Sequence, residues 1–151
     1  MVYLRRDIIS KKQLLGQILI KRGLITKEQL QNALDYQKKA GGVLGETLIK
    51  LGLVTEQDIV VALIVQCGLP YIAVNKYEID KKVIEAFPVT LARKYHIIPL
   101  DRVGDVLSVV MANPLDMAMI DEVERTTCCK VATFIATKTE IDEAIEKWYP
   151  K

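Results

Sequence analysis

The sequence predicts an α+β fold. Its N-terminal lobe is a four-helix repeat of two helical hairpins, and its second lobe has a small three-stranded, mostly antiparallel sheet with packed helices. Two observations support this prediction. A motif of 24 positions with helical periodicity occurs twice, at residues 14–37 and 43–66. After residue 68, β-rich runs alternate with short helical segments. We therefore predict two units, residues 1–68 and residues 69–151.

The two copies share more than aliphatic side chains. The shared residues of the first copy include Leu15, Gly16, Leu19, Gly23, Leu24, Thr26, Ala33, Leu34 and Gln37, which recur as Leu44, Gly45, Leu48, Gly52, Leu53, Thr55, Ala62, Leu63 and Gln66. Recurring leucines are typical of any two core helices, whereas recurring glycines and a recurring glutamine are harder to explain by packing. Two readings remain open, a twinned binding site and a duplicated scaffold.

Each copy contains the start and stop signals of a helical hairpin. In the first copy, we expect a helix over residues 12–22 to end at Gly23, which suits a left-handed cap. Thr26 then begins the next helix, and Gln29 completes a capping box. The second copy repeats these signals, although Asp58 is a poorer match at the position of Gln29.

Gly41 and Gly42 separate the hairpins, and Gly68 ends the second one. The elements expected after it are, in order, an extended piece (70–74), two short helices (80–87 and 89–95), two strands that form a hairpin (96–103 and 106–112), a helix (116–127), a third strand (130–136) and a last helix through residue 148.

Composition excludes several functional classes. The net charge of +2 is too small to indicate nucleic acid or an anionic membrane as a partner. No apolar run reaches the ~18 residues that span a bilayer, and the N-terminus lacks the apolar core of a secretory signal. Three cysteines without a C-x-x-C spacing favour buried thiols in a reducing compartment. We expect a cytoplasmic protein that does not insert into a membrane and has no metal site.

Catalytic signals are weak, and we predict that the chain is not an enzyme. The only histidine, His96, precedes a run of aliphatic residues and suits a structural role. No serine or cysteine lies in a nucleophile motif. The glycine-rich segment 41–45 is not followed by the lysine and hydroxyl residue of a P-loop, so ATP hydrolysis is not predicted. No residue is assigned a catalytic role, and no cofactor is expected.

The repeat fits a binding surface better. Gly16 and Gly45 lie near helix starts, where free backbone N–H groups favour an anion and glycine permits close approach. Gln37 and Gln66 can donate and accept hydrogen bonds, while the leucines wall an apolar slot. Two hairpins related by an approximate twofold would suit a ligand with two anions and two flat bases. A plain helical bundle has the same signals and remains the alternative.

The repeats resemble the paired R-L-G-x-x-L-x-x-x-G-x6-L-x-x-x-L-x-x-Q motifs of the N-terminal domain of type II secretion and type IV pilus assembly ATPases. In its MshEN branch, this domain resembles a receptor for cyclic di-GMP. The segments Gly68–Tyr71 and Val109–Asp116 are also similar to the second half of the family's domain. The resemblance extends from about residue 14 to residue 149.

The resemblance implies a set of ligand-contacting positions. They are Leu15, Gly16, Leu19, Gly23, Leu30, Leu34 and Gln37 in the first copy, and Leu44, Gly45, Leu48, Gly52, Ile59, Leu63 and Gln66 in the second. The chain departs from the family at the arginine that opens each motif, which is Leu14 in the first copy and Val43 in the second. Losing two planar cations would weaken nucleotide binding by a few kcal/mol, or about a hundredfold.

Three functional hypotheses follow. The first is a non-catalytic interaction and regulatory domain that links a secretion or pilus ATPase to the cytoplasmic part of an inner-membrane component, with the ATPase domain on the same or another chain. Such a domain would be peripheral to the inner membrane through its protein partner. The second is a cyclic di-GMP receptor that tolerates apolar residues at positions 14 and 43. In the third, the α+β lobe carries the function and the repeat only supports it. Asn113 and Asp116 would then reach from the turn before a helix toward the repeat, although helix capping explains them as well.

Overall fold

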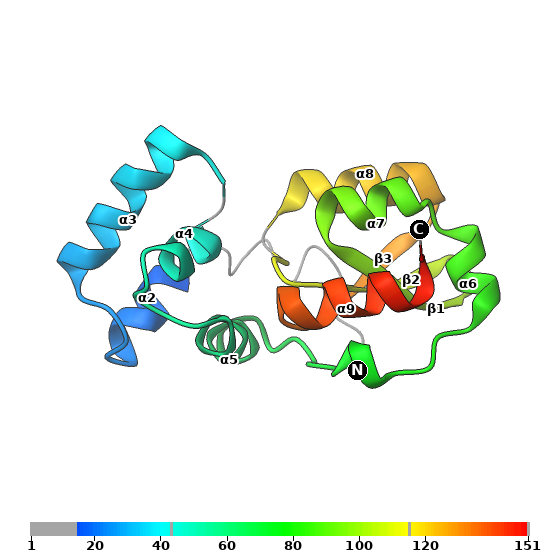
Figure 1. Ribbon diagram of the computed structural model, residues 1–151, viewed down its shortest axis with the longest axis horizontal. Coiled ribbons are helices and arrows are strands. Elements are labelled where there is room, and N and C mark those ends of the chain that lie inside the picture. Colours follow the sequence, from blue (N-terminus) through cyan, green and yellow to red (C-terminus); the bar gives the residue numbers. More distant parts are fainter. Residues whose placement is uncertain (1–14, 43, 115, 151) are drawn as a thin grey trace.

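The structure is a computed structural model that describes residues 15–42, 44–114 and 116–150. Figure 1 shows two lobes side by side along the long axis of the molecule. The helical repeat forms one lobe, and a small sheet with its helices forms the other. The predicted α+β class is therefore confirmed. The boundary after residue 68 stays a prediction.

Each motif copy of the repeat lobe forms two helices, as expected. The start predicted for the first helix, at residues 12–14, lies outside the described residues. The helices of this lobe are α2 (Leu15–Lys21), α3 (Lys27–Ala40), α4 (Leu44–Lys50) and α5 (Glu56–Cys67).

The first helix of each hairpin ends in the same left-handed turn. Gly23 and Gly52 both have a φ of 74°, which a residue with a β-carbon adopts only with strain. The N–H of Leu24 donates to the carbonyl of Leu19 at 3.0 Å, and the equivalent bond after Gly52 has the same length. These bonds satisfy carbonyls at the helix ends, so both predicted glycine caps are confirmed.

Capping boxes begin the second helix of each hairpin. The hydroxyl of Thr26 accepts from the backbone N–H of Gln29 at 3.1 Å, and the Gln29 side chain accepts from the N–H of Thr26 at 2.9 Å. Thr55 and Asp58 form the same two bonds at the same distances. Asp58, expected to be the poorer match, therefore completes its box as fully as Gln29 does.

The helices of the repeat lobe pair across the two hairpins. α2 lies against α5, and α3 lies against α4. Because α2 corresponds to α4 and α3 to α5, the two contacts are equivalent when the copies are exchanged. Leu19 and its counterpart Leu48 are both fully buried in the resulting core. The lobe therefore has an approximate internal twofold relationship.

The second lobe is built on a three-stranded sheet in the order β1-β2-β3. Figure 1 shows α7 and α8 next to each other along one side of this lobe and α9 along another. The strands are β1 (Ile97–Val103), β2 (Val106–Met111) and β3 (Lys130–Ile135), and the helices are the 3-10 helix η2 (Val74–Lys76), α6 (Lys81–Ala86), α7 (Val89–Tyr95), α8 (Met117–Thr127) and α9 (Lys138–Trp148).

The sheet is mixed rather than mostly antiparallel. β1 and β2 form the predicted antiparallel hairpin, with Val103 opposite Val106. β2 and β3 pair in parallel, from Val106 opposite Lys130 to Met111 opposite Ile135. The prediction was wrong for this pair because α8 connects the two strands, and a strand–helix–strand crossover returns the chain to the same end of the sheet.

Two residues of the second lobe differ from expectation at helix ends. His96, predicted to begin the first strand, is the C-cap of α7 with a φ of 54°, so β1 starts one residue later. Its Nδ1 lies 2.6 Å from Asp142 Oδ1, which fits the expected structural role. Cys129 is buried as expected, whereas Cys128 is exposed because it occupies the left-handed C-cap of α8.

Acidic side chains of α9 hold the segment that leads into the sheet. Their partners all lie between residues 71 and 96 of the chain. Glu140 accepts from Tyr71 at 2.5 Å, Glu143 accepts from Asn75 at 2.8 Å, and Glu146 accepts from Arg93 at 2.9 Å. With the contact of His96, these bonds join both ends of the second lobe.

The lobes share apolar and polar contacts. Leu69 and Ile135 belong to the hydrophobic cluster of the repeat lobe, and Met117 packs against that cluster. The hydroxyl of Thr139 donates to the carboxylate of Glu56, 2.9 Å from Oε2 and 3.1 Å from Oε1. The start of α5 is thereby joined to the start of α9. Among the described residues, no helix is long and apolar enough to cross a bilayer.

Candidate ligand site between the two lobes

The glycines that open the two motifs face equivalent side chains of the next helix. A β-carbon on Gly16 would lie 2.9 Å from Leu30 Cδ2, closer than van der Waals contact allows. A β-carbon on Gly45 would lie 3.6 Å from Ile59 Cγ2, which is an ordinary contact. The first copy is therefore closed around its glycine, while the second copy has room beside it.

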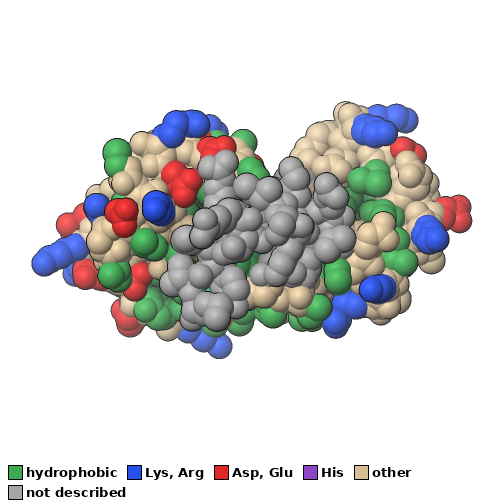
Figure 2. All heavy atoms as spheres, turned by 180° about the vertical axis from the view of Figure 1, so that it is seen from behind, with side chains coloured by type: hydrophobic (Ala, Val, Ile, Leu, Met, Phe, Trp, Pro, Cys, Tyr) green, Lys and Arg blue, Asp and Glu red, His purple; other side chains and the backbone are tan. Residues whose placement is uncertain are grey.

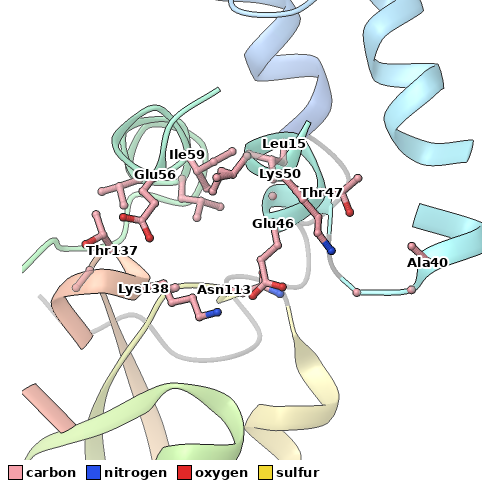
Figure 3. Close-up of a pocket in the computed structure, with 18 of the residues that line it drawn as sticks. Leu15, Ala40, Glu46, Thr47, Lys50, Glu56, Ile59, Asn113, Thr137 and Lys138 are labelled. Carbon is pink, nitrogen blue, oxygen red and sulfur yellow. The ribbon is translucent and has the colours of Figure 1, made fainter. Parts of the chain in front are cut away.

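An open cavity of about 560 Å³ lies between the repeat and the second lobe (Figure 3). This volume is within the range of small-molecule sites, about 300–1,000 Å³. The repeat lobe contributes Leu15, Tyr36, Ala40, Gly41, Gly42, Gly45, Glu46, Thr47, Ile49, Lys50, Glu56, Ile59, Val60 and Leu63, and the second lobe contributes Ala112, Asn113, Ala136, Thr137 and Lys138.

The cavity combines an apolar wall with charged groups from both lobes. Aliphatic side chains of α2 and α5 form the wall, and Glu46 and Lys50 lie one turn apart on α4. Figure 3 shows Glu46 and Asn113 pointing toward one another from opposite lobes, with Lys138 beside Asn113. Glu56, the other acidic group, holds Thr139 as described above. Such a site can contact a flat apolar ring, hydrogen-bond donors and an anion.

The structure brings four of the fourteen implied ligand positions into this cavity, namely Leu15, Gly45, Ile59 and Leu63. Three of the four come from the second copy, because the second lobe supplies the opposite wall only there. The arginine-replacing residues Leu14 and Val43 lie outside the described residues.

The other implied positions have different surroundings. Leu19 and Leu48 are core residues, Gly16 is buried, and Leu30, Leu34 and Leu44 are half-buried. Gly23 and Gly52 are the exposed caps already described. The Gln37 side chain donates to the carbonyl of Gly42 at 2.8 Å, so it shapes the glycine segment that lines the cavity. The side chain of Gln66 is not among those the structure describes.

Only one of the two residues considered in the turn before α8 lines the cavity. Asn113 does so, whereas Asp116 is the N-cap of α8 and accepts from the N–H of Met119 at 3.0 Å. The capping role is therefore confirmed for Asp116. Lys50 was not among the predicted site residues, although Lys21 occupies the same position of the first copy and could have indicated it. Lys138 had no such signal.

Within residues 15–42, 44–114 and 116–150, no group of three or more histidine, cysteine or acidic side chains could hold a metal ion.

A family model described as the MshEN domain matches residues 67–151, which is more than half of the chain. The chain belongs to the MshEN domain family. The match lies mainly on the α+β lobe, and the repeat motifs extend the resemblance to the helical lobe. The family predicted from the repeats is thus confirmed by the other half of the sequence.

Curated relatives of this MshEN domain are much longer proteins. The chain is 31% identical over 135 residues to the type IV pilus assembly ATPase PilB of Myxococcus xanthus, covering 89% of this chain and 24% of that protein. PilB of Thermus thermophilus is 35% identical over 139 residues, and the match covers 91% of this chain and 16% of that protein. Bacteriophage adsorption protein B of Escherichia coli is 28% identical over 137 residues, covering 91% of this chain and 18% of that protein. The chain spans about a quarter or less of these relatives.

Solved structures show the same architecture. The structure of MshE with cdg superposes with a TM-score of 0.76 and 28% identity, covering 89% of this chain and 98% of that one. The N-terminal domain of XpsE gives a TM-score of 0.75 at 23% identity, with coverage of 92% and 96%. Both lobes of this MshEN domain therefore belong to a known arrangement.

Proposed function

We propose that this MshEN domain is a non-catalytic regulatory and interaction domain of a type II secretion or type IV pilus assembly ATPase. The coverage of the PilB proteins carries the proposal, because a segment that matches 91% of this chain occupies only 16% of the Thermus protein. The chain thus corresponds to one module of a longer ATPase. ATP hydrolysis then belongs to a P-loop domain on the same or another chain.

In this proposal, the repeat lobe contacts the cytoplasmic part of an inner-membrane component, which keeps the domain in the cytoplasm and at the membrane through its partner. Two exposed aliphatic side chains one turn apart on α5, Val61 and Val65, support a protein contact. On the described part of the face in Figure 2, basic and acidic side chains are interspersed. A mixed surface of this kind favours a protein partner over nucleic acid.

Pull-down with purified cytoplasmic parts of the inner-membrane components tests this function. One component should be retained by the wild-type domain and lost with Val61→Asp or Val65→Asp. Val103→Asp is the matched control, because Val103 is a more exposed valine on the other lobe, 74% exposed against 58% for Val65. If the folded wild-type domain retains none of the components, the interaction function is wrong.

A second function is favoured by the similarity to MshE with cdg. In this alternative, the domain is a receptor for cyclic di-GMP, and its support is the collection of four motif positions in one cavity. Isothermal titration calorimetry should then show binding that Gln37→Ala or Gln66→Ala abolishes. Gln37 would act by positioning the glycine segment, since its amide bonds to Gly42. A wild-type domain that gives no heat with cyclic di-GMP would exclude this alternative.

A further inference from the structure

Two lysines from different lobes line the cavity. Lys50 lies in the last turn of α4, and Lys138 is the first residue of α9. Within the described part of the chain, neither side chain has a hydrogen bond or an ion pair, whereas other lysines such as Lys94 and Lys147 do. The cavity also contains Glu46 and Glu56, and Glu56 already accepts from Thr139, so the two lysines are the local positive charges that an anion can contact.

The same cavity contains surfaces that suit the rest of such a ligand. Motif residues Ile59 and Leu63 form an apolar wall of the cavity, and Gly45 lines the cavity beside them. Asn113 adds an amide from the second lobe. The wall and the two lysines therefore lie around one space, although they come from segments that are far apart in the sequence.

We propose that this cavity is a site for a phosphate-bearing ligand, and that Lys50 and Lys138 neutralise the phosphate from opposite lobes. The inference rests on the second proposed function and specifies it, because it names cations that replace the motif arginines absent at positions 14 and 43. A lysine is a compact charge and does not stack on a base as arginine does, so these lysines take over charge neutralisation only.

Glu46 is a negative charge close to Lys50 in the cavity lining. The two residues are spaced i and i+4 on α4, where a glutamate and a lysine attract each other. The first copy has Gln17 at the position of Glu46 and keeps Lys21 at the position of Lys50. Glu46→Gln therefore introduces a residue that the repeat already accommodates, and it should strengthen anion binding because it removes a negative charge from the cavity.

A ligand held by both lysines joins the two lobes. The lobes already contact through Glu56 and Thr139 beside the same cavity. Bound ligand should consequently raise the thermal stability of the domain, because it binds the folded arrangement of both lobes and not the unfolded chain.

The test is calorimetry with two probes, cyclic di-GMP and inorganic pyrophosphate. Lys50→Ala and Lys138→Ala should each weaken binding by about tenfold or more, as expected for a charge-assisted contact. Lys21→Ala is the control for Lys50, because Lys21 has the same place in the first copy and does not line the cavity. Lys81→Ala is the control for Lys138, since Lys81 also begins a helix.

The outcomes separate the site from the receptor function. If cyclic di-GMP binds and the cavity lysine variants bind like their controls, the site assignment is wrong and the receptor function stands. If only pyrophosphate binds and depends on both lysines, the receptor function is wrong and the site stands. If neither probe binds, both are wrong. Should a variant unfold, NMR of the wild-type domain with each probe replaces it. Shifts of the amide signals of Gly45 and Asn113 without a shift at Gly16 support the site. A shift at Gly16 without shifts at Gly45 and Asn113 overturns it.

Discussion

Leu30 fills the space beside Gly16, whereas Ile59 leaves space beside Gly45. The two pairs occupy equivalent positions of the repeat, yet the distance from a β-carbon to the facing side chain would be 2.9 Å in the first and 3.6 Å in the second. The shared glycine therefore conceals a structural difference, which comes from the different facing side chains. One glycine is needed for packing inside the lobe, and the other lies at the cavity.

Alanine at these two positions should have different effects on stability. Gly16→Ala forces the end of the Leu30 side chain to move and should lower the free energy of unfolding by about 1 kcal/mol. Gly45→Ala meets only ordinary contacts and should be neutral or stabilising by up to ~1 kcal/mol. Urea unfolding of the two variants checks this. Equal losses in both would contradict the packing difference.

The helix-ending glycines should behave as a matched pair. Gly23 and Gly52 have the same φ of 74°, and apart from the chain neighbours no described residue comes within 4 Å of a β-carbon built on either. Alanine at each position should therefore cost about 1 kcal/mol through backbone strain alone. Thermal melts measure this loss, and asparagine, which tolerates the left-handed region better, should cost less. A loss with alanine at only one position would show that the two turns differ.

Alanine variants at Asn113 and Asp116 should distinguish a ligand contact from a helix cap. Asp116→Ala removes the acceptor for the N–H of Met119 and should lower stability by about 1 kcal/mol. Asn113→Ala should weaken binding of a cavity ligand by about tenfold. Melting curves and calorimetry on both variants decide the matter. The distinction fails if Asn113→Ala binds like the wild type.

High pH should weaken the hydrogen bond between Tyr71 and Glu140 of α9. The hydrogen bond to Glu140, together with burial and the charge of that carboxylate, raises the pKa of Tyr71 to about 12 from 10.0. Since the folded state holds the phenol proton more tightly, this stabilisation is complete below pH 10 and is lost as the pH rises to about 12. The free energy of unfolding of Tyr71→Phe, measured in urea, should therefore fall less between pH 10 and about 12 than that of the wild type.

Tyr149 provides the control for that measurement. Burial also raises the pKa of Tyr149 to about 12, and its hydroxyl donates to the carbonyl of Ile84 at 2.9 Å. Part of the fall in stability should consequently remain in Tyr71→Phe. A pH profile identical to that of the wild type would show that the bond to Glu140 does not form in solution.

Restoring the motif arginines tests whether the scaffold still accepts the family's ligand. Leu14→Arg combined with Val43→Arg should create or strengthen binding of cyclic di-GMP, by about a hundredfold if both cations form charge-assisted contacts. Calorimetry measures the gain. Addition of Lys21→Ala is the control, because that lysine does not line the cavity. A folded double variant that shows no gain would mean that the slot is closed to this nucleotide.

Local signals were sufficient to predict nearly all the helices and strands. Thr26, Thr55 and Thr137 each begin a helix through a capping box, and the hairpin of β1 and β2 follows from the turn between two β-rich runs. The parallel pairing of β2 with β3 was missed, although the order strand, helix, strand predicts it. That error arose from counting strands and overlooking their connection.

The candidate site was less accessible to sequence reasoning. The family resemblance implied Gly45, Ile59 and Leu63, because all three lie within one copy of the repeated motif. Lys138 lies outside both copies and reaches the cavity only because the second lobe packs beside α4 and α5. Tertiary packing of this kind leaves no periodic signal in the sequence. The Glu56–Thr139 bond was missed for the same reason, since its partners are 83 residues apart.

The pairing of α2 with α5 and of α3 with α4 has a consequence for folding during synthesis. A hairpin that emerges first from the ribosome cannot complete its core, because each of its helices needs a partner from the other hairpin. Leu19 should stay solvent-accessible until α5 has left the exit tunnel. Nascent chains from which α5 has not yet emerged should thus be digested by protease, while those from which α5 has fully emerged should become resistant in a single step.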